Sequence, residues 1–281
     1  MEAQKIFKRY EYKYMLTLEQ LAALRELMEQ YMIADAFGRS TICNLYFDTP
    51  QYLLIRRSIE NHVYKEKIRL RTYGQATPDT TAFIELKKKY KKVVYKRRIS
   101  ARYEDAMQYL CQRADVIPHS QICSELNYAL SLYKEIQPVM YLSYEREAFY
   151  GKEDHELRIT FDQNILWRTE DLNLTSPVYG RALLQPGQVL TEIKIGHAMP
   201  LWLNHFLTEH HIYRTSFSKY GTAYKTLLME AGTTKRRCIG CNVTPIFIGR
   251  RTKLYRRRDA IIDLIEPRKT NLNIKGEHKY A

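Results

Sequence analysis

The sequence predicts an α+β protein built on an antiparallel β-sheet with one apolar face and one charged face. Five segments alternate charged and apolar residues with a period of two, at residues 9–13, 65–71, 83–87, 157–162 and 191–195. Because successive side chains of a strand point to opposite faces, each segment separates its Lys, Arg and Glu from its aromatic and aliphatic residues. The 23 tyrosines agree with this interpretation, since tyrosine favours strands. If the sheet curls, its charged face lines a lumen that suits a polyanion.

The first third of the chain predicts a helix followed by strands. Thr17 and Gln20 have the spacing of a capping box, and the apolar residues after them recur at helical intervals. The elements expected here are a helix over 18–32, a strand over 40–47, a short helix or turn over 51–57, a strand over 64–72, and a hairpin of strands over 81–88 and 92–99.

The remainder of the chain predicts two helices, more strands and two closing helices. The expected elements are helices over 103–113 and 121–133, strands over 138–150 and 155–163, a loop over 170–187, a strand over 188–196, and helices over 199–210 and 218–231. We expect residues 1–232 to form one domain, with 103–133 as a helical insertion. Residues 233–281 are expected to be a basic extension outside its core.

The net charge of +14 is unevenly distributed along the chain. Residues 233–281 hold 13 of the 45 Lys and Arg but only four of the 31 Asp and Glu. The body is therefore nearly balanced, which makes nucleic acid an unlikely partner. No apolar run approaches the roughly 20 residues that span a bilayer, and the N-terminus has no signal-peptide core, so we expect a cytoplasmic protein.

The charged faces supply the candidate functional residues. The set is Arg9, Glu11, Lys13, Lys67, Arg69, Arg71, Glu85, Lys87, Arg146, Arg158, Glu192, Lys194 and Lys219. Cations outnumber carboxylates in it, and a phosphate chain would correct that imbalance, because Arg and Lys both bind phosphate oxygens. The few glutamates could hold a divalent ion together with phosphate. No glycine-rich phosphate loop is present, so side chains would have to bind the phosphate.

The order of the short motifs resembles a known family. The motifs are Arg9-Tyr10-Glu11-Tyr12-Lys13-Tyr14, Leu45-Tyr46-Phe47-Asp48, Ile68-Arg69-Leu70-Arg71, Glu85-Leu86-Lys87, Tyr144-Glu145-Arg146, Leu157-Arg158-Ile159-Thr160-Phe161-Asp162, Glu192-Ile193-Lys194 and Phe217-Ser218-Lys219-Tyr220. Over about residues 5–230 this order is similar to the VTC-type polyphosphate polymerase domain, a member of the triphosphate tunnel (CYTH-like) superfamily.

The resemblance implies a closed antiparallel tunnel of about eight strands with a basic lumen. It also implies transfer of the ATP γ-phosphate, with Mn²⁺ or Mg²⁺, onto a growing polyphosphate chain. The implied phosphate-binding residues are Lys13, Arg69, Arg71, Lys87, Arg146, Arg158 and Lys219, with Lys194 beside them and Tyr144 and Ser218 as polar contacts. Glu192 is the implied metal ligand, and Glu11 and Glu85 are further candidates. A membrane-protein partner for export, recruitment to the membrane by it, and inositol phosphates as regulators are further expectations.

The sequence departs from the family pattern at two places. The basic residue expected just before Phe217 is Ser216, and Arg214 is a candidate replacement. The Glu-x-Glu-x-Lys start of the wider superfamily reads Arg9-x-Glu11-x-Lys13, which removes one carboxylate. A hydrolase with a carboxylate-rich metal site is therefore less favoured.

Two alternatives to a polymerase stay open. One is a triphosphatase or nucleotide hydrolase on the same fold, which would release orthophosphate. The other is a non-catalytic sensor that binds polyphosphate or inositol phosphate, and binding that is unaffected by Glu192→Ala would favour it. Nucleic-acid binding ranks last, and would gain ground if deletion of 233–281 abolished all polyanion binding.

Overall fold

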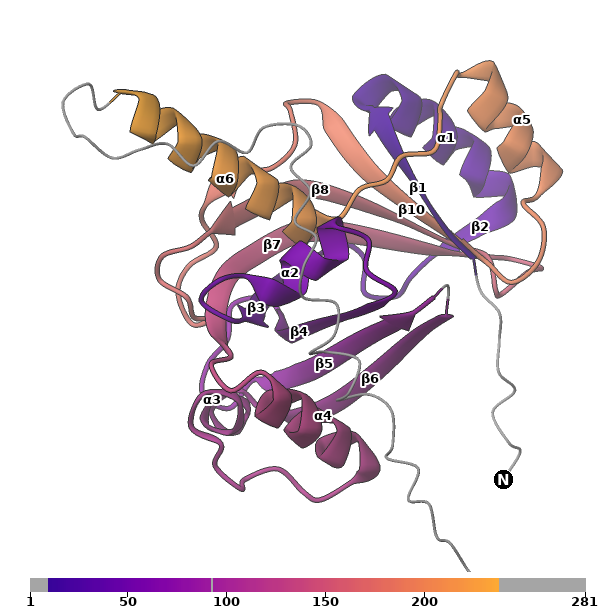
Figure 1. Cartoon of the computed structure of the whole chain (residues 1–281). Helices are drawn as coiled ribbons and strands as arrows, with labels where there is room; N and C mark the ends of the chain where they lie inside the picture. Colours follow the sequence, from indigo (N-terminus) through magenta and orange to yellow (C-terminus); the bar gives the residue numbers. More distant parts are fainter. Residues whose placement is uncertain (1–9, 92, 238–281) are drawn as a thin grey trace, which may run out of the picture. The chain divides into compact units, whose positions relative to one another are not determined.

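The computed structural model describes residues 10–91 and 93–237, and the chain divides into a compact unit over Met1–Lys235 and a second over Arg236–Ala281. Figure 1 labels the strands and helices of the first unit, except the short β9. Its strands are β1 (Tyr10–Thr17), β2 (Met32–Ala34), β3 (Ser40–Asp48), β4 (Tyr64–Tyr73), β5 (Thr81–Tyr90), β6 (Val93–Arg102), β7 (Gln137–Gly151), β8 (Arg158–Arg168), β9 (Arg181–Ala182) and β10 (Gln188–Ile195). Its helices are α1 (Leu18–Tyr31), α2 (Leu53–Ile59), α3 (Tyr103–Gln112), α4 (Gln121–Leu132), α5 (Leu201–Glu209) and α6 (Lys219–Arg237).

The strands form one antiparallel sheet in the order β1-β10-β8-β7-β3-β4-β5-β6, with β2 added to β7 and β9 to β8. The predicted antiparallel sheet with flanking helices is present. The predicted closed barrel is not confirmed, because within residues 10–91 and 93–237 the end strands β1 and β6 do not pair. Whether the end strands of a sheet pair depends on how the sheet curls, which the alternation within each strand does not specify.

Helices cover the apolar face of the sheet in two places. Helices α3 and α4 pack on β3, β4 and β5, where Leu45, Leu70 and Ile84 are fully buried. Helices α1 and α5 pack on β1, β8 and β10 around Leu24 and Ile193. Figure 1 shows these two helix pairs beside opposite ends of the strand order. Burial of the alternating apolar residues therefore turns their charged neighbours to the other face.

On that other face, α2 and the first turns of α6 cover one end of the sheet. They pack with Tyr46, Leu190 and Tyr220 in a third apolar cluster. Asp48, which is fully buried, ties the three elements together. Its carboxylate accepts hydrogen bonds from the backbone N–H groups of Leu54 and Ile55 at 2.8 and 2.9 Å, and from the Tyr220 hydroxyl at 3.0 Å. The rest of the face is left to the charged side chains.

Local sequence rules account for most element boundaries. Thr17 and Gln20 form the predicted capping box, with both reciprocal hydrogen bonds present, so α1 begins where expected. The short strands β2 and β9 were not predicted, because three and two residues are too few to show an alternating pattern. Helix α6 continues to Arg237, past the predicted end at 231. No described helix is both long and apolar enough to cross a membrane.

Candidate functional site

The charged face encloses a cavity of about 850 Å³. We call it the lumen. Strands β1, β3, β4, β5, β6, β7 and β10 contribute to its wall, together with α2 and the start of α6. The predicted residues that line it are Glu11, Lys13, Lys67, Arg69, Arg71, Glu85, Lys87, Tyr144, Arg146, Glu192, Lys194, Ser218 and Lys219. Period-two alternation alone therefore identified most of the charged wall.

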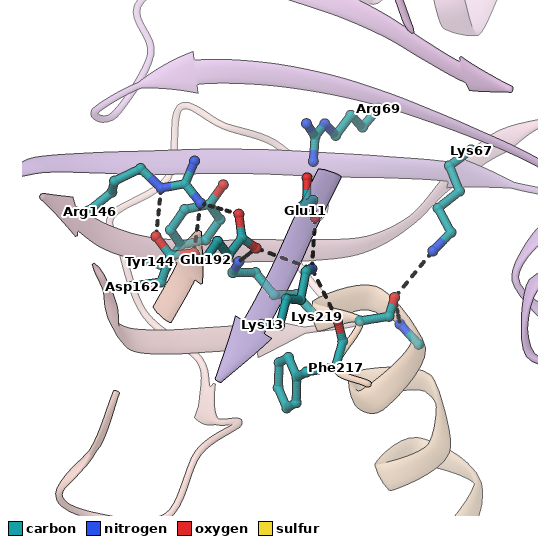
Figure 2. A network of polar contacts seen from close by, with 12 residues as sticks. Glu11, Lys13, Lys67, Arg69, Tyr144, Arg146, Asp162, Glu192, Phe217 and Lys219 are labelled. Atoms are coloured by element: carbon teal, nitrogen blue, oxygen red, sulfur yellow. Dashed lines mark hydrogen bonds and ion pairs between the residues drawn. The ribbon is translucent and has the colours of Figure 1, made fainter. Parts of the chain in front are cut away.

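A first group of ion pairs, which we call the Glu192 cluster, is built on two buried carboxylates. Glu192 comes from β10 and Asp162 from β8, and their partners are Lys13, Arg146 and Lys219 (Figure 2). The Lys219 ammonium lies 2.5 Å from Asp162 Oδ2 and 3.0 Å from Glu192 Oε1. Arg146 binds both oxygens of Asp162 at 2.6 and 2.7 Å and reaches Glu192 Oε2 at 3.2 Å.

The cations of the Glu192 cluster control its ionisation. Burial opposes the charge on Glu192, but Lys219, Lys13 and Arg146 together hold its pKa well below the usual range. The pKa of Lys219 is raised, because Asp162 and Glu192 outweigh the effect of its own burial. A buried ion pair is stable only with such dense partnering. Glu192 and Lys219 are therefore both ionised at neutral pH.

A second group, the Glu85 cluster, is built on one carboxylate. Glu85 of β5 is only 2% exposed. Arg69 Nε lies 2.6 Å from its Oε2, while Lys96 Nζ and Arg98 Nε each lie 2.8 Å from its Oε1. Arg71 Nε is 3.9 Å from Oε2. Against the effect of burial, these cations lower the pKa of Glu85 far below its usual range.

Tyr144 of β7 lies among the cations of both clusters. Arg71 donates from Nη2 to its hydroxyl at 3.2 Å and from Nε to Asn44 Oδ1 at 3.0 Å. The Lys219 ammonium sits 4.6 Å from the centre of the Tyr144 ring and the Arg146 guanidinium 5.1 Å. Burial opposes ionisation of the phenol, but Arg146, Arg71 and Lys219 more than compensate and lower its pKa. The hydroxyl is therefore a strong hydrogen-bond donor toward an anion in the lumen.

The same lumen is lined by a pair of lysines, Lys67 of β4 and Lys87 of β5, which are register partners. We call them the lysine pair. Lys67 donates to Ser218 Oγ at 3.2 Å (Figure 2). In the described part of the chain, no carboxylate oxygen lies within 4.0 Å of either ammonium. The charges of this pair are therefore uncompensated by direct contacts.

Comparison with known families decides the assignment. The family model described as the VTC domain matches residues 8–228, which is most of the chain. The chain belongs to the VTC domain family. The resemblance that the motif order indicated is thereby confirmed. No curated protein matches this VTC domain.

Solved structures give weaker likenesses. A putative adenylyl cyclase from Hippeastrum, described as having a dominant triphosphatase activity, is 14% identical with a TM-score of 0.49, over 78% of this chain and 96% of that one. A putative adenylate cyclase from Bacillus halodurans is 12% identical with a TM-score of 0.47, over 74% and 92%. One from Vibrio parahaemolyticus is 14% identical at 0.41, over 78% and 98%. Scores this low carry no argument about the activity of this VTC domain.

Some predicted residues of the VTC domain lie elsewhere. Arg158 is the first residue of β8, is exposed, and does not line the lumen, because it stands at the end of its strand. Arg214 does not replace the missing basic residue. Its guanidinium stacks 3.9 Å from the Tyr12 ring on the apolar face of β1, whereas Ser216 lines the lumen. Arg9 and the extension from residue 238 onward lie outside the described residues.

Sequence reasoning missed three charged residues of the two clusters. Asp162 was within a recognised alternating segment, but its role depends on the register that places it beside Arg146. Lys96 and Arg98 alternate on β6, which was predicted as a strand without a functional face. The signal in both cases was the period-two pattern, extended by one more residue or one more strand.

The three predicted metal ligands of the VTC domain are not equivalent. Outside residues 1–9, 92 and 238–281, no group of three or more His, Cys, Asp or Glu converges as a metal site. Glu85 does not fit, because arginines and a lysine occupy both of its oxygens. Lysines and Arg146 also contact both oxygens of Glu192, but Glu192 shares one cation with a second carboxylate: the Lys13 ammonium lies 3.2 Å from Glu192 Oε1 and 3.6 Å from Glu11 Oε1. Two carboxylates that converge on one cation suit a divalent ion that arrives with a nucleotide.

Proposed function

We propose that this VTC domain is a polyphosphate polymerase that transfers the γ-phosphate of ATP to the end of a polyphosphate chain in its lumen. The observation that carries the proposal is the arrangement of lumen charge. Two clusters fix cations on the strands, and the lysine pair in the same lumen has no carboxylate of the described residues in direct contact. A linear polyanion would satisfy all three positions at once, which a single phosphate could not.

The chemistry needs positioning and charge neutralisation more than a covalent nucleophile. The bond between the γ-phosphorus and the β,γ-bridging oxygen breaks, and a terminal oxygen of the chain forms the new bond, releasing ADP. Lys13, Arg146 and Lys219 would hold the transferred group, and the Tyr144 hydroxyl would donate to it. Glu11 and Glu192 would hold a divalent ion, which neutralises phosphate charge when bound.

The ionisation of the carboxylates favours transfer over hydrolysis. A hydrolase gains from a general base that activates water, and such a base works best with a pKa near the operating pH. The pKa values of Glu192 and Glu85 are lowered by their cations, so both are weak bases. The terminal oxygen of a polyphosphate chain is already an anion and needs no base. We therefore rank the triphosphatase second and the non-catalytic sensor third.

The test is an incubation of the purified full chain with ATP and Mn²⁺, followed by gel separation of polymer and a parallel assay of free phosphate. We expect polymer from the wild type and none from Glu192→Ala or Arg69→Ala. The matched control is Arg97→Ala, because Arg97 pairs with Glu125 at 3.1 Å and does not line the lumen. Free phosphate without polymer would indicate a hydrolase. Neither product, with polyphosphate binding retained, would indicate a sensor.

The predicted partners follow from the same proposal. ATP and polyphosphate are the ligands of the lumen. Export of the polymer through a membrane-spanning partner, and regulation by inositol phosphates, stay predictions from the family resemblance. Activity of the purified chain without any other protein would show that transfer itself needs no partner.

A further inference from the structure

The lysine pair has a geometry that is unfavourable without a ligand. Lys67 and Lys87 are direct register partners on neighbouring antiparallel strands, and both line the lumen. Side chains opposite each other in this way lie roughly 5 Å apart at Cβ, and like charges there destabilise the sheet. The cations of the two clusters contact Glu85, Glu192 or Asp162, whereas, in the part of the chain that the structure describes, Lys65, Lys89, Lys194 and Lys225 line the lumen without such a contact.

Lys67 is surrounded by positive charge. The cations that act on it are Lys65 and Arg69 on its own strand, Lys87 on β5 and Lys13 on β1. Its partial burial and these four cations lower the pKa of Lys67 to about 7. Near neutral pH, about half of the molecules therefore carry Lys67 as the uncharged amine.

The remaining neighbours do not restore that charge. Glu11 and Glu192 line the same cavity, but both contact the lysine of β1 and lie beyond 4.0 Å of Lys67. From α6, Lys219 is held by carboxylates of the Glu192 cluster and Lys225 adds another cation to the wall, while Ser218, just before the helix, accepts a hydrogen bond from Lys67. Helix α2 adds uncharged Ser58 to the wall. A ligand is the remaining source of negative charge for this position.

We propose that Lys67 and Lys87 form a phosphate subsite that takes up a proton when it is filled, so that polyphosphate binding is coupled to protonation of Lys67. This rests on the proposed function only in that the lumen binds linear polyphosphate. The amine of Lys67 gains one proton from solvent, no covalent bond changes, and the resulting ammonium pairs with a phosphate oxygen. Filling the subsite raises the pKa of Lys67, because an anion nearby favours the charged form.

The coupling has a defined size. Since Lys67 is half-protonated near pH 7 in the free protein, a ligand that binds only the ammonium form loses about tenfold in affinity between pH 6 and pH 8 through this group. At pH 8, binding draws close to one proton per ligand into the site through Lys67. A fixed charge at residue 67 would show neither effect.

The experiment is calorimetric titration of the full chain with tripolyphosphate, in EDTA to prevent turnover, at pH 6 and pH 8. Because tripolyphosphate itself binds protons in this range, each measurement is compared with Lys67→Arg, whose guanidinium is always charged. At pH 8, two buffers with different ionisation enthalpies measure proton uptake. We expect the wild type to lose about tenfold more affinity than Lys67→Arg, and to take up nearly one more proton.

Controls separate this coupling from general effects of charge. Lys88 lies on β5 next to Lys87 but pairs with Glu125 at 3.2 Å, so Lys88→Arg should retain the wild-type pH dependence. Lys67→Met should bind weakly with the pH dependence of Lys67→Arg. Equal pH dependence in the wild type and Lys67→Arg would overturn the coupling while leaving a polyphosphate-binding lumen intact. Absence of tripolyphosphate binding by the wild type at both pH values would overturn the coupling, and the same absence with Mg²⁺ in place of EDTA would overturn the proposed function as well.

Discussion

The two carboxylate-centred clusters and the lysine pair line the same lumen but differ in whether their cations contact a carboxylate. In the Glu85 and Glu192 clusters, each cation has a carboxylate within about 4 Å, so the guanidinium and ammonium groups are held in place before any ligand arrives. Lys67 and Lys87 have no such partner among the described residues. The comparison teaches that the carboxylates orient the cations of the clusters, while the two opposed lysines have no carboxylate in direct contact.

The largest effect should come from removing a carboxylate of the Glu192 cluster. Asp162 is fully buried and holds both Arg146 and Lys219. We expect Asp162→Ala to lower the free energy of unfolding by about 3–5 kcal/mol, because two cations lose their buried partner. Urea denaturation measures this. As a control, Glu125→Ala removes the half-buried partner of Lys88 and Arg97 and should cost about 0–1 kcal/mol. An equal loss of unfolding free energy in both variants would contradict the greater importance of the buried carboxylate.

Glu85→Gln tests the second cluster and has a pH signature. We expect a loss of about 2 kcal/mol at pH 7, since charge-assisted hydrogen bonds become neutral ones. The pKa of Glu85 is lowered in the folded state, so its contribution is full above its ordinary pKa of 4.5 and is lost as pH falls toward the folded value. The stability difference between wild type and variant should therefore shrink between pH 7 and pH 3. A difference that is constant with pH would show that Glu85 does not act through its charge.

Lys67→Met should change the free energy of unfolding in the opposite direction, by stabilising the folded protein. Because the pKa of Lys67 is lowered to about 7, the unfolded chain binds more protons between pH 7 and 10.5, and wild-type stability rises with pH across that window. The variant avoids the cost of the charge, so we expect it to be more stable by on the order of 1 kcal/mol at pH 6, after allowing for solvent screening, and by less at pH 9. Thermal unfolding at both pH values measures this. A variant less stable than wild type at pH 6 would show that Lys67 is not under electrostatic strain.

The smallest effect should come from Arg158→Ala. The family resemblance makes Arg158 a phosphate ligand, but the structure places it exposed at the end of β8 and outside the lumen wall. We expect less than about a twofold change in tripolyphosphate affinity, since an exposed charge is screened by solvent. Titration of the variant beside the wild type measures it. A tenfold loss would place Arg158 in the site after all.

The sequence was informative where a signal is local. Alternation with a period of two identified Lys13, Arg69 and Glu192 as lumen residues, because strand geometry alone decides which face a side chain takes. The capping box at Thr17 located the start of α1 for the same reason. Neither inference needs knowledge of which strands are neighbours.

Pairing between distant residues could not be inferred in this way. Glu85 was expected to bind metal, but the register of β4, β5 and β6 surrounds it with Arg69 and Arg98 instead. Closure of the sheet likewise depends on whether its two end strands pair, and the pattern within a single strand does not show this. Arg158 follows the same alternation as Glu192, yet its position at a strand end removes it from the cavity.

The residues of the site lie far apart in the sequence, and this determines the order in which their contacts can form during synthesis. Strand β1 pairs with β10, and the Lys13 ammonium donates to the carbonyl oxygen of Phe217, 204 residues away in the chain. Lys13 and Arg146 are therefore synthesised well before Glu192 and Lys219 exist to complete their contacts. Before Glu192 is made, the only described carboxylate partners of these two cations that the chain already contains are Glu11 for Lys13 and Asp162 for Arg146. The charge arrangement of the lumen is therefore complete only once the start of α6 has been synthesised.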